Sequence, residues 1–559
     1  MTKTAYRIMT GLILLPLIAF GQGAAQALTP SQQMDKLFDF WNRLDQPGFA
    51  VVVVKDGQVA YQNVFGVACQ EHLSPITPNT VFNVSTLAKP FVGLAVALLE
   101  KQGKLSLDDD VRKFIPELPD FGTPIKVRHL LYQTSGLRDW LTVLQLAGRD
   151  REEVTIDKVL SMVKSQKKLA FPPGDRAQNS NTNYDLLAEV VKRATGKPFS
   201  DWAWENIFKP LKMTRTQFRD NCRSIFDDEA LSYNFTRSEY LRGIDNLSLA
   251  GSHSLFTSIA DLAKWLLDLE TGRVVGPEIY AKMFTAGVLN DGKTSGFGYG
   301  VEFGTRAGKN GIFQLGEWAG SGAIFVYFPD DRIGFVVLAN WDYTSAGGFA
   351  DGIISIYLPP SLPAPAAQKS RPEPARKAVK VSPQKLDLCA GDYRIGPNRI
   401  FSIIRTGGQL FLASGGQKYV LTSLSDTEFL LDFAQARITF QKNKEGKVHQ
   451  FLWSQGGEDI IAPKVVVVKP TPQELQEFAG AYSNEELGLS YAVELRGEAI
   501  VLVASGQSPI RLTPDEKDRF ASNSRIVPTV VFQRDGQGRV SGFIIDSDLV
   551  RDLVFKRAT

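Results

Sequence analysis

The sequence predicts a mixed α/β domain, with one antiparallel sheet flanked by helices, followed by two small antiparallel β-barrels. Strand-like runs stand near both ends of the first part of the chain, at Gly48–Ala68 and Ala323–Asn340, and helical patterns lie between them. This order predicts a single sheet that the two ends of the domain close together. An internal repeat in the last part of the chain predicts the barrels.

Both strand-like runs read as hairpins. Asp56-Gly57 separates two apolar runs and is a strong signal for a tight turn. In the second run the chain turns at Pro329-Asp330-Asp331. The clearest helical patterns between the hairpins cover Pro90–Gln102, Asp185–Ala194 and Ile259–Glu270. These elements place the α/β domain over residues 28–358.

Residues 359–383 are rich in Pro and Ala and show no apolar period, which predicts a semi-extended linker. After it, Pro383–Tyr393 matches Pro472–Tyr482, and Phe440–Phe451 matches Phe532–Phe543. Each copy has strand patterns with turn signals about every ten residues. We therefore expect one barrel over residues 384–468 and another over 469–559. Cys389 aligns with Phe478, which favours a buried apolar role over a reactive thiol.

The first residues read as a signal peptide. Lys3 and Arg7 precede an apolar run, Met9–Phe20, and Ala25-Gln26-Ala27 is a small-residue cleavage signal. The apolar run is too short to span a membrane. We expect cleavage after Ala27, no stable membrane anchor, and a periplasmic or secreted protein.

Composition narrows the function classes. The formal net charge is only +3, and no basic run is interleaved with aromatic residues, so we expect no nucleic-acid partner. The three cysteines and four histidines are scattered, without metal-ligand spacing. We expect no metal and no cofactor. The expected partner is a small-molecule or peptide ligand, and the sequence predicts no particular oligomeric state.

A hydroxyl and a lysine stand at the start of the first long helix. Thr86 precedes Lys89 by three residues, so the two side chains share a helix face. Ser85 lies four residues before Lys89 and also shares that face, but it is first interpreted as the helix N-cap. By itself this spacing is common, and a cap with a surface lysine would explain it.

The surrounding sequence resembles the penicillin-recognising serine hydrolases, which include class C β-lactamases, D-alanyl-D-alanine peptidases, related esterases and D-aminopeptidases. The resemblance covers nearly all of residues 28–358, and the two barrels are similar to those appended in the D-aminopeptidase branch. It implies a β-lactamase-like sheet with a helical lobe. The segments that carry it are Gly48–Ala68, Pro75–Pro119, Ile125–Trp140, Phe171–Trp202, Ala250–Leu266, Gly296–Phe303 and Pro329–Asn340.

The same resemblance implies the site residues and three departures from the family pattern. Thr86 stands at the nucleophile of Ser-x-x-Lys, with Ser85 in the small-residue place before it. Asn179-Ser180-Asn181 stands where relatives have Tyr-Ser-Asn. Glu317-Trp318-Ala319 is the best match to His-x-Gly or Lys-Thr-Gly on the strand beside the site. Two other segments, Lys293–Gly296 and Lys309–Gly311, also resemble the third motif.

These departures predict impaired acyl transfer. The methyl group of Thr86 restricts its rotamer, Asn179 cannot relay a proton as a phenol can, and Glu317 replaces a cation. The predicted catalytic positions are Thr86, Lys89, Asn179 and Glu317, and the predicted substrate-binding positions are Ser180, Asn181 and Trp318. Gln133 stands where relatives usually carry a histidine and is interpreted as structural.

We favour a pseudo-hydrolase that binds a peptide-like or amino-group-bearing ligand. One alternative is an active amidase, esterase or D-aminopeptidase-type enzyme that uses Thr86 or Ser85 with Lys89. Another is a structural protein of the cell envelope in which the barrels make the interactions.

Overall fold

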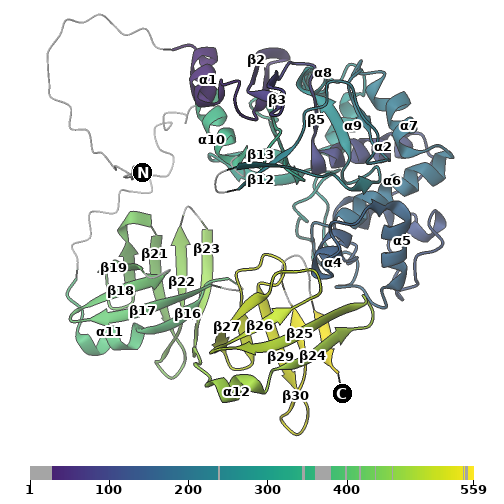
Figure 1. Ribbon diagram of the computed structural model, residues 1–559. Coiled ribbons are helices and arrows are strands. Elements are labelled where there is room, and N and C mark those ends of the chain that lie inside the picture. Colours follow the sequence, from purple (N-terminus) through teal and green to yellow (C-terminus); the bar gives the residue numbers. More distant parts are fainter. Residues whose placement is uncertain are drawn as a thin grey trace, which may run out of the picture.

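The computed structural model describes residues 28–236, 239–342, 346–358, 379–396, 399–414, 417–434, 436–455, 458–545, 547 and 552–558. The predicted signal peptide and most of the predicted linker lie outside the described residues. In Figure 1 the α/β domain occupies the upper part of the molecule, and the two barrels lie side by side below it.

The central sheet is antiparallel, with the strand order β12-β13-β14-β15-β1-β2. Its strands are β1 (Phe49–Lys55), β2 (Gln58–Phe65), β12 (Glu302–Arg306), β13 (Lys309–Trp318), β14 (Ser321–Phe328) and β15 (Ile333–Ala339). The first strand pairs with the last, from Phe49 opposite Ala339 to Lys55 opposite Ile333. The prediction that the two ends of the domain close one sheet is therefore confirmed.

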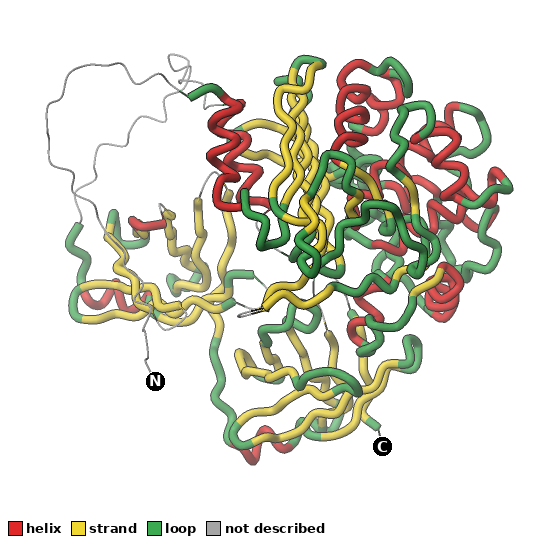
Figure 2. Tube along the Cα trace, turned by 45° about the horizontal axis from the view of Figure 1, so that its top comes forward, coloured by secondary structure: helices red, strands yellow, loops and turns green. Residues whose placement is uncertain are grey.

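Helices cover both faces of this sheet (Figure 2). Val51 and Val53 pack with α1 (Pro30–Phe38) and α10 (Ala346–Tyr357). Ala50 and Val52 point to the opposite face, toward α2 (Lys89–Lys101) and α8 (Ile259–Thr271). Alternate residues of a strand face opposite sides, so a strand that is covered on both sides is apolar throughout. This explains the unbroken run of valines in β1.

The predicted hairpins and helices are present. Asp56 and Gly57 both have positive φ, 51° and 73°, as the tight turn between β1 and β2 requires. Helices α2, α6 (Asn181–Thr195) and α8 cover the three predicted helical patterns. The loop between β14 and β15 contains the predicted turn at Pro329-Asp330-Asp331.

The remaining elements of the domain build the helical lobe and several short strand pairs. The other helices are α3 (Val127–Leu131), α4 (Trp140–Leu146), α5 (Ile156–Ser165), α7 (Phe199–Ala203) and α9 (Pro277–Met283), with short turns η1 (Asp39–Trp41), η2 (Ser85–Ala88), η3 (Val111–Lys113) and η4 (Trp204–Phe208). The short strands are β3 (Val67–Cys69), β4 (Ser74–Pro75), β5 (Val81–Asn83), β6 (Val154–Thr155), β7 (Gln217–Phe218), β8 (Tyr233–Thr236), β9 (Glu239–Arg242), β10 (Leu247–Ser248) and β11 (Leu255–Ser258).

Each C-terminal repeat folds as a closed barrel of eight strands, preceded by a short helix. Barrel 1 contains α11 (Pro383–Cys389), β16 (Gly391–Arg394), β17 (Ile400–Thr406), β18 (Gln409–Ser414), β19 (Gln417–Ser423), β20 (Glu428–Leu431), η5 (Asp432–Ala434), β21 (Ala436–Lys442), β22 (Val448–Gln455) and β23 (Glu458–Val465). Barrel 2 contains α12 (Pro472–Gln476), β24 (Gly480–Asn484), β25 (Leu489–Arg496), β26 (Ala499–Val503), β27 (Ile510–Glu516), β28 (Arg519–Ala521), β29 (Thr529–Arg534), β30 (Val540–Ile545) and β31 (Leu553–Arg557).

The predicted equivalence of Cys389 and Phe478 holds in three dimensions. Cys389 is 1% exposed and belongs to the core of barrel 1, where burial raises the pKa of its thiol to about 11. Tyr393 donates its hydroxyl hydrogen to the Cys389 carbonyl at 2.8 Å, and Tyr482 makes the matching bond to Phe478 at 2.7 Å. Cys389 is thus a buried apolar residue.

Barrel 2 contacts both of its neighbours. Its Glu486 carboxylate accepts bonds from the Arg138 guanidinium at 3.3 Å and from the Lys167 amide at 3.0 Å. Arg394 of barrel 1 forms an ion pair with Asp515 of barrel 2 at 2.9 Å. Within the described residues, none of the helices has both the length and the apolar character needed to cross a membrane.

Candidate active site

The site is built around the short turn η2, which joins strand β5 to helix α2. Ser85, at its start, is fully buried and has a positive φ of 51°, an unfavourable conformation for a residue with a Cβ atom. No side chain caps η2, and the Ser85 hydroxyl has no hydrogen-bond partner. The prediction that Ser85 is the N-cap is therefore wrong. A fully buried hydroxyl also cannot meet a substrate in this conformation.

Lys89 begins α2 and is only 3% exposed. Its ammonium donates to the Asn179 Oδ1 atom at 2.8 Å. Burial lowers the pKa of Lys89 to about 8, against the opposing effects of Asp139, Glu302 and Asp185. The structure therefore brings Lys89 and Asn179 together, and it gives the lysine the lowered pKa that a general base would need.

Strand β13 runs past Thr86. The Thr86 hydroxyl donates to the Leu315 carbonyl at 2.6 Å, and the Gln314 Nε2 atom lies 3.4 Å from Thr86 Oγ1. Gly316 lies against η2 so closely that a Cβ atom there would be 2.4 Å from the Val84 carbonyl oxygen. Gln314-Leu315-Gly316 thus has the spacing and the position expected of the third motif, with Gln314 beside the hydroxyl.

Glu317 does not join this group. Its side chain is exposed, and it lies one residue out of step with Gln314 and Gly316, on the other face of the strand. Trp318 is half-buried, donates from Nε1 to Asp245 Oδ1 at 3.1 Å and packs edge-on against His253 at 5.6 Å between ring centroids. The structure therefore puts Gln314, rather than the predicted Glu317, next to Thr86.

In each of the two other segments that resemble the third motif, the lysine forms an ion pair with an aspartate. Lys309, at the first residue of β13, contacts Asp331 at 2.6 Å. Lys293 contacts Asp291 at 2.7 Å, and its side chain is 80% exposed. Neither of these ion pairs involves Thr86 or Lys89.

Gln133 holds the second motif in place. Its Oε1 atom accepts from the Ser180 amide at 3.0 Å and from Asn183 Nδ2 at 2.6 Å, and its Nε2 atom donates to Asn179 Oδ1 at 3.2 Å. Its own φ is +60°. Gln133 is thus structural, as predicted. It also positions Asn179, which was not predicted.

The other two residues of the second motif, Ser180 and Asn181, lie at the start of α6. The Asn181 amide donates to Asp139 Oδ1 at 2.6 Å, and Asn181 is partly exposed. Ser180 is 2% exposed, and its hydroxyl is buried without a hydrogen-bond partner. A ligand can therefore reach Asn181, whereas Ser180 is shielded in this conformation.

Glu302, on β12, is a member of the site that sequence reasoning missed. Its Oε1 atom accepts from Asn179 Nδ2 at 3.3 Å, and it is partly exposed. Burial raises the pKa of the Glu302 carboxyl, and the Lys89 ammonium opposes that rise. Glu302 lies in Gly296–Phe303, a segment that carries the family resemblance, but no role was predicted for it, because its proximity to Asn179 depends on how β12 lies in the folded domain.

Two backbone N–H groups can face a bound carbonyl oxygen. The Leu315 carbonyl points from β13 toward Thr86, and strand geometry turns the Glu317 amide, two residues further on, to the same side. The Thr86 amide lies at the start of η2, where N–H groups have no partner within the turn. The arrangement resembles an oxyanion hole. It depends on the backbone of Glu317 and not on its side chain.

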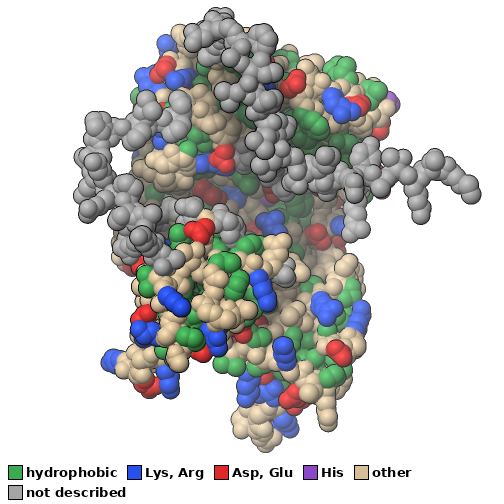
Figure 3. Space-filling model, turned by 90° about the vertical axis from the view of Figure 1, so that its left-hand side faces the viewer, with side chains coloured by type: hydrophobic (Ala, Val, Ile, Leu, Met, Phe, Trp, Pro, Cys, Tyr) green, Lys and Arg blue, Asp and Glu red, His purple; other side chains and the backbone are tan. Residues whose placement is uncertain are grey.

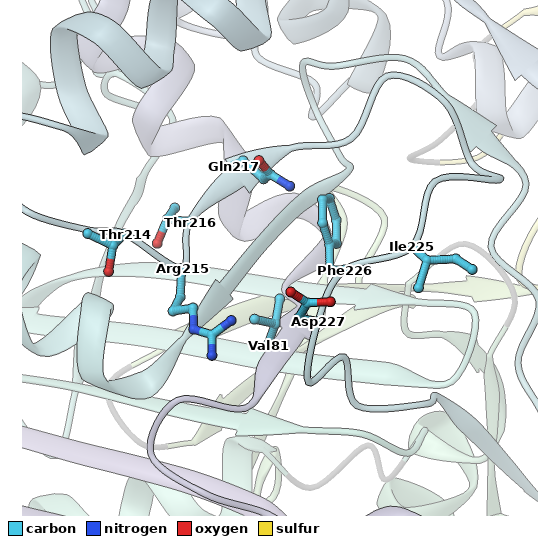
Figure 4. Close-up of a pocket in the computed structure, with 8 residues that line it drawn as sticks. All are labelled: Val81, Thr214, Arg215, Thr216, Gln217, Ile225, Phe226 and Asp227. Carbon is cyan, nitrogen blue, oxygen red and sulfur yellow. The ribbon is translucent and has the colours of Figure 1, made fainter.

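A separate pocket lies on another part of the domain. This cavity has a volume of about 250 Å³. Figure 4 shows residues that line it, among them Arg215, Asp227 and Ile225. Ile225 is 90% exposed. Neither Thr86, Lys89 nor Asn179 lines this pocket.

Comparison with known proteins identifies the family. The family model described as Beta-lactamase matches residues 34–357. Penicillin-binding protein 4* of Bacillus subtilis (strain 168) is 24% identical over 451 residues, covering 77% of this chain and 97% of that protein. D-aminopeptidase of Gluconobacter oxydans (strain 621H) is 25% identical over 544 residues, covering 92% and 96%.

A solved structure shares the fold. The octameric penicillin-binding protein homologue from Pyrococcus abyssi superposes with a TM-score of 0.51 at 22% identity, covering 77% of this chain and 99% of that one. Fold and site together define a protein related to the penicillin-recognising serine hydrolases. The chain belongs to the β-lactamase family, and its curated relatives include a penicillin-binding protein and D-aminopeptidases.

Proposed function

We propose that this protein is a pseudo-hydrolase, in which acyl transfer is impaired and the site binds a peptide-like ligand that carries an amino group. The observation that carries this proposal is the bonding of the two reactive groups. The Lys89 ammonium donates to a carboxamide oxygen, that of Asn179, and the Thr86 hydroxyl donates to a backbone carbonyl.

The described side chains that hydrogen-bond to Thr86 or Lys89 offer no proton relay to a leaving group, and Glu302 reaches the site only through its hydrogen bond to Asn179. Gln133, Asn179 and Gln314 are all carboxamides, which offer hydrogen bonds but no proton transfer near neutral pH. The β-branched Thr86 has restricted rotation and is crowded by its methyl group. These features support binding through hydrogen bonds over turnover.

Carboxylates around the site favour a cationic group. Asp139 and Glu302 both act on the buried ammonium of Lys89. Glu302 is partly exposed, so an amino group of a ligand can approach it. The names of the relatives called D-aminopeptidase support a peptide-like ligand with an amino group.

Glu302→Gln should weaken binding of the dipeptide D-alanyl-D-alanine by about 10-fold or more, because a charge-assisted hydrogen bond is lost. Titration calorimetry at pH 7 would measure this loss of affinity. The N-acetylated dipeptide should bind to the wild type as weakly as the unmodified dipeptide binds to Glu302→Gln. Glu317→Gln is the matched control: its carboxylate is exposed outside the cluster, and affinity should not change. Equal effects of the two variants, or no binding of the dipeptide at all, would refute the proposed ligand class.

A second function is favoured by two observations. The pKa of Lys89 is lowered to about 8, as a general base requires, and the Thr86 and Glu317 amides are placed as an oxyanion hole. The protein would then be an active amidase, esterase or D-aminopeptidase-type hydrolase with Thr86 as nucleophile. Wild-type turnover of D-alanine p-nitroanilide that is lost in both Thr86→Ala and Lys89→Ala would establish this function in place of the first.

We also propose export to the periplasm or beyond the cell, from the N-terminal pattern alone. N-terminal sequencing of protein from an envelope or culture fraction should begin near Leu28. An intact Met1 in that fraction would contradict the proposal.

A further inference from the structure

The two barrels are copies whose interiors can be compared position by position. Tyr393 pairs with Phe401 across β16 and β17, and Tyr482 pairs with Tyr491 across β24 and β25. Phe401 of barrel 1 is therefore the counterpart of Tyr491 in barrel 2. By the same pairing, Leu412 corresponds to Leu502 and Trp453 to Ile545. Below, the mouth of a barrel means its end opposite the short helix α11 or α12.

The mouth of barrel 2 is filled by the chain itself. Leu146, at the end of α4, is 1% exposed and belongs to the apolar core of this barrel. The Tyr491 hydroxyl donates to the Leu146 carbonyl at 2.6 Å, and Gln507 Nε2 donates to the same carbonyl at 2.9 Å. In Figure 1, α4 lies above barrel 2, at the end away from α12. Ala147 packs against the same core, and Gln507 Nε2 also donates to the Gln145 carbonyl at 2.6 Å. Barrel 2 thus binds the C-terminal end of a helix, with the Leu146 side chain buried and the last carbonyls hydrogen-bonded.

At the mouth of barrel 1, no described segment from outside the barrel takes this place. A cavity of about 700 Å³ opens there, and the described residues that line it all belong to barrel 1. Phe401 and Trp453 are walls of this cavity, and Ile460 stands on its rim with 41% of its surface exposed. The Arg399 guanidinium also lines it, 4.7 Å from the Phe401 ring. Figure 3 views the molecule from the left-hand side of Figure 1 and shows hydrophobic side chains among lysines and arginines on the outer surface of its lower half.

We propose that the mouth of barrel 1 is a docking site for the C-terminal turn of a helix from another protein, which inserts a leucine-sized side chain between Phe401 and Trp453. The occupied mouth of barrel 2 identifies this type of occupant. Burial of such a side chain between aromatic walls favours binding through the hydrophobic effect. Arg399 complements the partial negative charge at the C-terminal end of a helix. Phe401 lacks the hydroxyl of Tyr491, so Arg399 or Gln417, which also lines the cavity, meets the carbonyl.

A peptide with the sequence of residues 139–149 tests this proposal on the full-length protein. It carries a photoreactive leucine at the position of Leu146, and mass spectrometry locates the crosslinks. We expect saturable binding, with crosslinks in barrel 1 between Ile395 and Ile460. Crosslinks confined to barrel 2, where the peptide would replace α4, would overturn the proposal.

Variants at two neighbouring residues distinguish peptide binding in the mouth from binding to the outer wall of the barrel. Ile460→Glu puts a charge in the mouth and should weaken peptide binding at least 10-fold. Ile461, 59% exposed, is not part of the cavity lining, so Ile461→Glu should leave binding unchanged. Unaltered melting curves show that both variants fold. Equal loss in both, or binding of dodecanoate in the mouth without binding of the peptide, would contradict peptide docking.

Discussion

The wild-type protein should form no covalent adduct with a fluorescent penicillin, whereas the triple variant Thr86→Ser, Asn179→Tyr, Gln314→His should form one. Serine removes the methyl group that crowds the attack. Tyrosine supplies a proton relay next to Lys89, and histidine at 314 provides an ionisable donor near the nucleophile, where Gln314 Nε2 now lies 3.4 Å from Thr86 Oγ1. Labelling should rise by about 100-fold or more, because correct placement of reacting groups has effects of this size.

The register of β13 supplies a sharp control for this experiment. A triple variant with Glu317→His in place of Gln314→His puts the imidazole on the exposed face of the strand, so it should stay unlabelled. Thr86→Ser alone should help little, since groups that act as a unit are not additive. Intact-mass spectrometry after incubation reads the adduct directly. Labelling of the wild type, or equal labelling of both triple variants, would refute the impaired mechanism or the assignment of Gln314.

Lys89→Met should stabilise the α/β domain at pH 7 while abolishing any hydrolysis. Lys89 is 3% exposed, and its pKa is lowered from 10.5 to about 8, chiefly by burial. A shift of this size corresponds to about 3 kcal/mol against the charged form. Replacing the lysine by methionine removes this cost, but it also removes the hydrogen bond to Asn179. We therefore expect a net increase of about 1–2 kcal/mol in the free energy of unfolding.

The pH dependence of Lys89→Met gives a second readout. Between about pH 8 and 10.5 the unfolded wild type binds more protons at Lys89 than the folded form, so the wild-type free energy of unfolding rises with pH. The advantage of the methionine variant should therefore shrink over this range. Urea denaturation at pH 7 and pH 10 tests this, with the exposed Lys293→Met as control. A variant that is less stable than the wild type at pH 7, or a stability difference that does not change with pH, would show that burial does not destabilise the charged form of Lys89.

Local patterns predicted most of the fold. The Asp56-Gly57 turn, the helix of Lys89 and the matched repeats are set by residues near one another in sequence, and each is present. Closure of the sheet by β1 and β15 was also predictable, since apolar strands at both ends of a domain leave few alternatives. In the site, the family resemblance implied the positions of Lys89 and Asn179, and the fold brings the two side chains together.

The features that sequence reasoning missed all depend on contacts between distant segments. The third motif was predicted at Glu317 because the sequence around it does not determine which residues of β13 lie next to Thr86. Gly316, which no Cβ could occupy against the Val84 carbonyl, was the available signal for Gln314. Ser85 reads as a cap from its type, but its positive φ comes from the tight link between β5 and η2. Glu302 carries no local signal.

Pairing of the first strand with the last also constrains how the chain folds during synthesis. The Gly48 amide donates to Asn340 Oδ1 at 2.7 Å, across 292 residues of sequence. Until the ribosome has made that asparagine, β1 has no partner on one side, and its valines stay open to chaperones and to aggregation. The barrels are built from successive neighbours and carry no such delay, apart from the pair that closes each ring. A domain of this topology therefore reaches its native state only late in synthesis.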